Sequence, residues 1–184
     1  MNIELSKAVL HLIESQPVLS QRGQPAGMPE MESLNRECGG VIPEWLIEFM
    51  TTYPLCGADL GMEDTDAEEF EPADWTSRLL YFAKRDQYPQ LAWVEWSTPT
   101  VMRSAMLEDA IGMALLKRGF VNVAHDGSSR DPWFVPTDRG DNPPLFAISV
   151  CAAAETDSEL MDELELVCGK LSELFLKIKA VQLP

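Results

Sequence analysis

The sequence has few basic side chains. It contains 14 Lys and Arg residues against 30 Asp and Glu residues, which gives a formal net charge of −16. Proteins that bind a nucleic-acid backbone use Lys and Arg to displace counterions, and the basic residues here are scattered. The same negative field repels anionic lipid. We therefore expect neither a nucleic acid nor a membrane surface as partner. A cationic partner is favoured by electrostatic steering, although acidity can also serve solubility alone.

Long apolar runs and paired cysteines are missing too. The longest uncharged apolar stretch, Leu145 to Ala154, is about half of what a membrane-spanning helix needs. The chain begins Met1-Asn2-Ile3-Glu4, without a basic-then-apolar leader. We therefore expect a cytoplasmic protein without a membrane-spanning segment. Reduced thiols are expected in that compartment. None of the four cysteines, which are Cys38, Cys56, Cys151 and Cys168, forms a C-x-x-C pair.

Motifs for catalysis are weak. His125 and Asp126 precede Ser128 and Ser129, but sequence neighbours in a strand point to opposite faces, whereas a triad needs the imidazole between the other two groups. No G-x-S-x-G motif frames either serine. Carboxylates are abundant, so a carboxylate-based hydrolase remains a remote alternative, and it requires a pocket with two convergent carboxyl groups. We expect no catalytic residues.

Metal and cofactor motifs are equally weak. The 2 histidines and 4 cysteines show none of the close ligand pairs of zinc sites. The acidic run that starts at Asp64 resembles the start of a calcium loop, but it lacks the glycine at position six, and position twelve is Trp75. No phosphate-binding loop is present. We expect no metal and no cofactor.

The apolar pattern predicts an α+β fold. The length of 184 residues fits a single domain over 1–184. Helical spacing and terminator residues predict helices over 3–15, 31–38, 43–53 and 98–117, and short apolar runs predict strands over 79–83, 91–96, 120–124, 133–135 and 145–151. Residues 17–30 are rich in Pro and Gly and predict a flexible loop.

A long C-terminal helix is the most strongly predicted element. Thr156 and Glu159 have the spacing of a capping box. A helical apolar stripe then continues to Ile178, with acidic residues in the first turns and Lys177 near the end, which suits the helix dipole. We expect this helix and the N-terminal helices to pack on a central, largely antiparallel sheet.

One acidic segment, residues 63–74, is a candidate partner-binding surface. A block of like charges repels itself and is expected on an exposed connection or a solvated helix face. The neighbouring Trp75 is the tryptophan expected outside the core, because aromatic residues are enriched in binding hot spots. The segment has no basic residue, and its seven acidic residues are Glu63, Asp64, Asp66, Glu68, Glu69, Glu71 and Asp74.

Several short motifs, in order, resemble the SUKH superfamily. A helix that ends at Gly39-Gly40 is followed by an apolar-Pro-Glu step, an aromatic helix and a Gly-containing turn. Later come a strand with an Asp-Gly turn and an Asp-aromatic strand. The residues that carry the resemblance are Pro43, Glu44, Trp45, Phe49, Gly57, Asp126, Gly127, Asp131 and Trp133. Departures are Tyr53-Pro54-Leu55-Cys56-Gly57 where the family usually has Asn-Gly-Gly, and Arg130 in place of the glycine before Asp131.

The resemblance implies a non-catalytic role. Bacterial members of the superfamily are typically immunity proteins that neutralise toxins, and fungal relatives are regulatory scaffolds. It also implies helices packed on an antiparallel sheet, and no active site to transfer. We therefore expect an immunity protein that binds a cationic toxin domain stoichiometrically, with a housekeeping scaffold or regulator of the same fold as the alternative. The sequence leaves the oligomeric state open.

Overall fold

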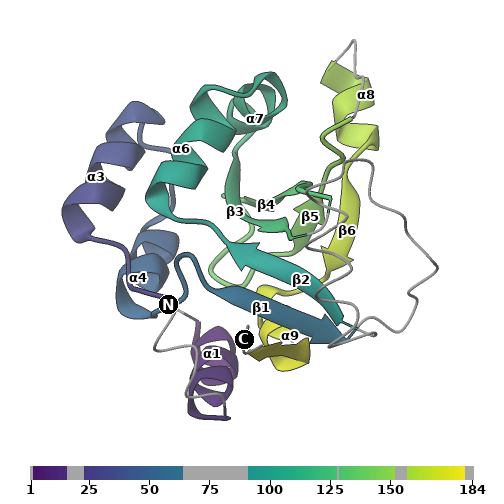
Figure 1. Ribbon diagram of the computed structural model, residues 1–184. Coiled ribbons are helices and arrows are strands. Elements are labelled where there is room, and N and C mark those ends of the chain that lie inside the picture. The colour runs from purple at the N-terminus through teal and green to yellow at the C-terminus, as the bar shows by residue number, and fades with distance from the viewer. Residues whose placement is uncertain (1, 16–22, 64–90, 128, 152–156, 181–184) are drawn as a thin grey trace.

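The computed structural model describes the chain except for residues 1, 16–22, 64–90, 128, 152–156 and 181–184. Within the described residues the fold is α+β, as the sequence predicts. Helices surround one sheet in which all neighbouring strands run antiparallel (Figure 1). In this part of the chain, no helix combines the length and the apolar character that a bilayer crossing requires.

The sheet order in the described residues is β6-β5-β4-β3-β2-β1-β7. Consecutive strands from β1 to β6 are neighbours, and the chain then crosses to the far end of the sheet, where β7 pairs with β1. The strands predicted over 91–96, 120–124 and 133–135 are confirmed, that over 145–151 is shorter than predicted, and 79–83 lies outside the described residues. The strands are β1 Asp59–Glu63, β2 Leu91–Trp96, β3 Phe120–Asp126, β4 Pro132–Pro136, β5 Leu145–Ala147, β6 Glu165–Cys168 and β7 Ile178–Ala180.

The helices near the N-terminus follow the predicted pattern, with one change. α1 (Ile3–Ser15) and α4 (Glu44–Thr52) are confirmed. α3 (Met28–Glu37) begins inside the segment that was predicted to be a loop over 17–30. Its start is compatible with Pro29, because a proline in the first turn gives up an N–H that has no partner within the helix.

The helix predicted over 98–117 is two helices, α6 (Pro99–Leu107) and α7 (Ala110–Leu116). The side chain of Asp109 accepts a hydrogen bond from the Gly112 N–H at 2.9 Å and so begins a new helix. A Cβ atom at Gly112 would lie only 1.6 Å from the Ala105 carbonyl oxygen. The absence of a side chain at this position therefore allows α7 to pack closely against the end of α6.

The prediction of one long C-terminal helix is wrong. The segment forms α8 (Asp157–Asp162), β6, α9 (Leu171–Lys177) and β7. In β6, Leu166 is 62% exposed whereas Cys168 is buried. These two residues pair with Phe146 and Leu145 of β5. The predicted cap, Thr156, lies outside the described residues.

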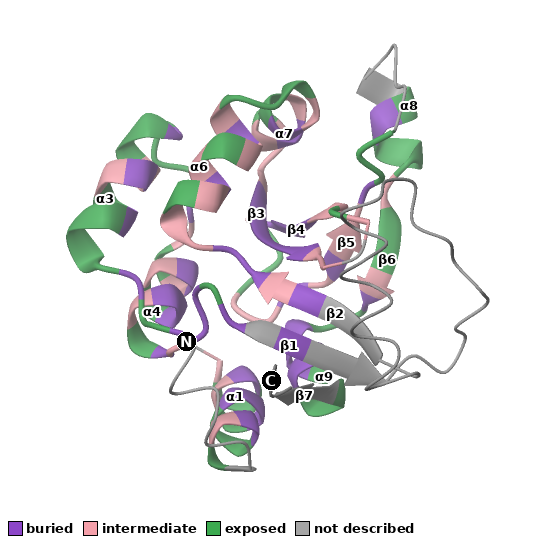
Figure 2. Ribbon diagram, in the orientation of Figure 1, coloured by how far each residue is buried: buried purple, intermediate pink, exposed green. Residues whose placement is uncertain are grey.

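Both faces of the central strands are covered (Figure 2). In β4, Trp133 and Val135 join the larger apolar core, whereas Phe134 between them joins a smaller cluster with Leu115 of α7 and Leu160 of α8. This division follows from the alternation of side chains along a strand. The larger core contains helix residues from α1, α3, α4, α6 and α9.

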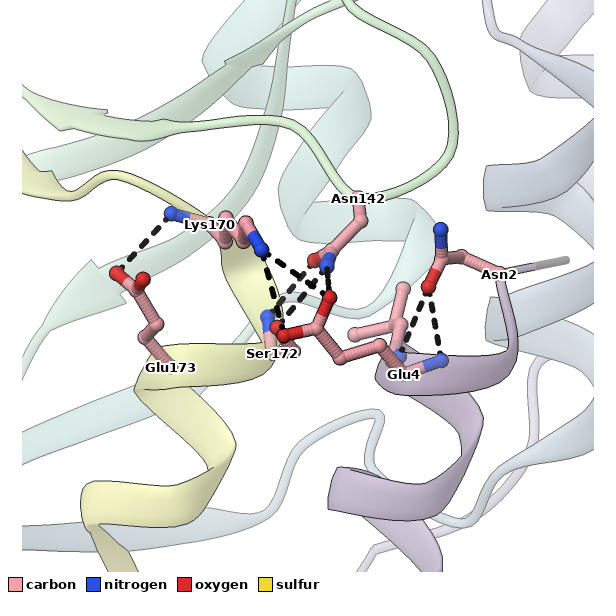
Figure 3. Close-up of polar contacts among 7 residues, drawn as sticks. Asn2, Glu4, Asn142, Lys170, Ser172 and Glu173 are labelled. Atoms are coloured by element: carbon pink, nitrogen blue, oxygen red, sulfur yellow. Dashed lines mark hydrogen bonds and ion pairs between the residues drawn. The ribbon is translucent and has the colours of Figure 1, made fainter.

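A polar cluster, which we name the α1–α9 clasp, joins the starts of α1 and α9 (Figure 3). It consists of Glu4, Asn142, Lys170 and Ser172. The Asn142 side chain accepts from the Ser172 N–H at 2.9 Å and donates to the Ser172 hydroxyl at 2.9 Å and to Glu4 at 3.3 Å. Lys170 Nζ lies 3.3 Å from Glu4 Oε2. Asn142 therefore caps α9 from a loop far away in the sequence.

Candidate functional site

A groove of about 760 Å³ opens between α3 and α4. In Figure 1, α3 lies at the outside of the molecule, beside α4 and α6. Each of the two helices that form the groove has a buried side and a solvated side (Figure 2). The residues that line the groove are Met28, Glu32, Glu44, Trp45, Ile47, Glu48, Thr51 and Thr52.

Helical periodicity places these side chains together. On α4, Leu46, Phe49 and Met50 are buried in the core. Trp45, Ile47 and Glu48 lie at other angles around the helix and line the groove. On α3, Met28 and Glu32 are one turn apart, and both are exposed. The α3–α4 groove is thus the outward face of two amphipathic helices whose inward faces form part of the core.

The charge of the groove is negative. It is lined by three glutamates, Glu32 from α3 and Glu44 and Glu48 from α4, and none of the described residues that line it is basic. All three side chains are exposed. Glu44 lies in the first turn of α4, where the positive end of the helix dipole stabilises a carboxylate. All the charged residues that line the groove in the described part of the chain are therefore acidic.

A second hollow, on the other side of α3, differs in this respect. It has a volume of about 360 Å³ and lies between α3 and α6. Arg103 of α6 lines it and forms an ion pair with Glu37 of α3. The carboxylate of Glu37 also accepts a hydrogen bond from Ser33 at 3.2 Å. Here the protein supplies its own cation, so the hollow offers less negative potential to a partner.

Trp45 differs from the other residues that line the α3–α4 groove in having a buried polar atom without a hydrogen-bond partner in the described structure. Its side chain is partly buried and packs against the larger core. The indole Nε1 is buried, and no acceptor lies within hydrogen-bond distance in the described structure. An unpaired buried donor costs about 1–3 kcal/mol. A phenylalanine would avoid this cost, so the indole is not explained by packing alone.

The other motif residues serve the fold rather than the groove. Phe49 is fully buried, and its ring centroid lies 5.6 Å from that of Trp96 and 5.7 Å from that of Phe175. Trp133 is also buried. Gly57 has a φ of 73°, which favours glycine, and its N–H donates to the Trp96 carbonyl at 2.8 Å.

The turn after β3 is also structural. The Asp126 side chain accepts from the Ser129 N–H at 2.7 Å, and Gly127 lies within the turn. Asp131 accepts from the Val150 N–H at 2.8 Å. Of the motif residues, only Glu44 and Trp45 line the α3–α4 groove, and Pro43 is the N-cap residue of α4.

The histidine and serine near this turn are not arranged as a triad. His125 Nε2 lies 3.1 Å from Glu95 Oε2 on the neighbouring strand β2. The Ser129 hydroxyl instead accepts from the Asp131 N–H at 3.3 Å. Ser128 lies outside the described residues. The described side chains are therefore explained by strand pairing and turn formation.

The predicted acidic segment, residues 63–74, is almost entirely outside the described part. Glu63 is the last residue of β1. The other six acidic residues and Trp75 lie in the range 64–90, outside the described residues. The structure instead brings together a different acidic surface, which the sequence analysis missed. The available signal was the helical spacing of Glu44 and Glu48 on the polar face of a predicted helix.

Comparisons of the chain with protein-family models, with curated proteins and with solved structures found no match. The resemblance to the SUKH superfamily therefore stays a prediction from the sequence.

Proposed function

We propose that this chain is a non-catalytic binding protein that takes a cationic protein partner into the α3–α4 groove. The observation that carries the proposal is that three exposed glutamates line the same groove as Trp45. The exposed Met28 adds apolar surface. An apolar centre with a charged rim is the usual anatomy of a protein-binding site.

The partner class that fits best is a cationic bacterial toxin domain, which makes the chain an immunity protein. The net charge of −16 supports this, because complementary charge raises the association rate of an inhibitor. The SUKH-like motifs support it as well. Specificity would come from the groove, since long-range charge does not choose among cationic partners.

The alternative is a housekeeping scaffold or regulator with the same fold, in which acidity serves solubility. The two functions differ in what the groove carboxylates do. In an immunity protein they contact the partner, so their position matters. In a scaffold whose acidity serves solubility, only the total charge matters.

The gene neighbourhood is examined first, because an adjacent toxin gene favours immunity and an unrelated operon favours the scaffold. The decisive experiment then uses a purified toxin domain encoded by such an adjacent gene. We expect a stoichiometric complex that abolishes toxin activity. The variant Glu32→Gln/Glu44→Gln/Glu48→Gln should weaken binding about tenfold or more, because charge pairs in a desolvated interface contribute strongly. The matched control is Glu14→Gln/Glu163→Gln/Glu165→Gln, which has the same net charge and removes exposed carboxylates outside the groove.

Isothermal titration calorimetry at two salt concentrations measures the affinity, and urea unfolding verifies that both variants are folded. Equal weakening by the two variants would contradict the groove as the docking site. Failure to bind or inhibit the neighbouring toxin would contradict the immunity function and favour the scaffold.

A further inference from the structure

We propose that the outward face of α1 is the contact surface of a homodimer, in which the α1 helices of two copies pack antiparallel around Leu10. The inference stands apart from the proposed function, because it concerns a different helix and a second copy of this chain. Three observations carry it: an exposed apolar line on α1, the zero net charge of this line, and the order of its two charges.

The first observation is that α1 has apolar residues on two faces. Its inward face is buried in the larger core through Leu5, Val9 and Leu12. Ile3 and Leu10 lie on the opposite face, about two turns apart, and they are 73% and 46% exposed. A helix that only covers a core carries polar residues on its outward face. The two exposed side chains are therefore not explained by the packing of α1 on its own chain.

These two residues belong to a line along the helix, which we name the α1 stripe. It consists of Ile3, Lys7, Leu10 and Glu14, and all four are exposed. Their spacing of four, three and four residues keeps them on one side of a helix. In Figure 1, α1 lies at the border of the molecule, next to α9. Figure 2 shows its exposed residues on the side away from the sheet.

The second observation concerns charge. The stripe carries one base, Lys7, and one acid, Glu14, so its net charge is zero, whereas the whole chain carries −16. Two copies of so acidic a molecule repel each other, and the repulsion is weaker where the facing surfaces are neutral. A cationic partner is instead drawn to an acidic surface. A second copy is therefore the occupant that the α1 stripe fits best.

The third observation is the order of the two charges. In a two-fold dimer the same patch meets itself, so every contact between two different residues occurs twice. When two α1 helices run antiparallel with Leu10 at the centre, Lys7 lies three residues before the centre and Glu14 four residues beyond it. Lys7 of each copy then comes level with Glu14 of the other copy. Parallel packing would instead bring like charges together.

Sedimentation equilibrium over a range of protein concentrations tests the inference. One helix pair buries less surface than a standard interface, which is about 1,600 Å², so we expect a mass that rises from one chain toward two as the concentration increases. Leu10→Asp should abolish this rise, because it places a charge at the centre of the contact. Urea unfolding verifies that the variant is folded. A mass of one chain at every concentration of the original protein would overturn the inference.

Two charge reversals test the antiparallel arrangement. Lys7→Glu and Glu14→Lys should each raise the dissociation constant of the homodimer about tenfold, because each turns two attractive charge pairs into two repulsive ones. The two substitutions change the net charge in opposite directions, so a general charge effect cannot weaken both homodimers. An equimolar mixture of the two variants should recover the affinity of the original protein, because each copy of one variant then meets opposite charges on the other.

Arg36→Glu is the matched control. It makes the same change of charge as Lys7→Glu at an exposed position of α3, and it should change the dissociation constant little. An effect as large as that of Lys7→Glu would overturn the inference. A mixture of the two reversed variants that fails to recover the affinity would overturn it too, because the two charges would then not face each other.

Discussion

The α1–α9 clasp and the α3–α4 groove are both polar surfaces formed by helices, but they differ in the charges that they bring together. In the clasp, Asn142 uses both its oxygen and its nitrogen, and Glu4 has Lys170 beside it. In the groove, the charged residues of the described lining are three glutamates, and the buried Trp45 Nε1 has no acceptor in the described structure. A satisfied network stabilises a fold, whereas an unpaired buried donor such as the Trp45 Nε1 requires a separate explanation.

The largest expected effect is a loss of unfolding free energy at alkaline pH, when two buried thiols ionise. One thiol lies near each of the two regions. Cys168 lies two residues before Lys170 of the clasp, and the thiol of Cys56 is 3.9 Å from the Met50 carbonyl of α4. Burial raises the pKa of each thiol from 9.0 to about 11. The unfolded chain therefore releases these protons at lower pH than the folded chain. The stability that the neutral thiols contribute is complete below pH 9.0 and is lost as the pH rises to about 11.

Two pKa units for each thiol correspond to about 2–3 kcal/mol of unfolding free energy. Urea unfolding at pH 8, 10 and 11 measures this loss. The Cys56→Ala/Cys168→Ala variant is the control, because its stability should fall less steeply with pH even though it starts lower. Parallel curves for the two proteins would show that other groups, such as lysines and tyrosines, dominate.

The second prediction breaks the clasp. Asn142→Ala removes the acceptor of the Ser172 N–H and leaves the fully buried Ser172 hydroxyl without its donor. We expect the free energy of unfolding to fall by about 2 kcal/mol, because buried polar groups are left unpaired. Glu4→Gln is the matched control. It removes only an exposed ion pair and should cost less than about 1 kcal/mol.

Equal losses in Asn142→Ala and Glu4→Gln would contradict the view that Asn142 is the centre of the clasp. Thermal unfolding followed by circular dichroism distinguishes the two results.

The smallest expected change in stability is at the groove. Trp45→Phe removes the unpaired indole N–H but also some packing against the core. Because the two effects oppose each other, we expect the free energy of unfolding to stay within about 1 kcal/mol of the original. A loss of 3 kcal/mol or more in urea unfolding would show that Trp45 is chiefly a core residue. Trp133→Phe, at a buried position, is the comparison and should cost more.

Sequence patterns predicted elements that are stabilised locally. α4 follows from its apolar face, and β3 follows from a short apolar run closed by an Asp-Gly turn. The apolar pattern predicted the wrong element where a tertiary contact determines the secondary structure. The apolar residues of 156–178 have helical spacing, but the chain pairs β6 with β5, and Asn142 caps α9 from a distant loop. Neither contact can be deduced from neighbouring residues.

The groove was missed for a related reason. Glu44 and Trp45 were identified as motif residues, but Glu32 reaches the same surface only because α3 packs beside α4. In addition, Met28 fell in a segment that was predicted to be a loop. A site formed by two helices requires their relative position, which composition and periodicity do not contain.

The pairing of β7 with β1 constrains how the molecule is made. It joins positions as far apart in the chain as Leu60 and Ala180, and α1 packs on both α9 and β7. During translation, the earlier segments emerge first, and this strand pairing cannot form until the later segments have been synthesised. One border of the sheet therefore stays unprotected until synthesis reaches residues 178–180, and a nascent chain is exposed to aggregation at this border during that interval. Contacts of such long sequence separation also slow refolding of the finished chain.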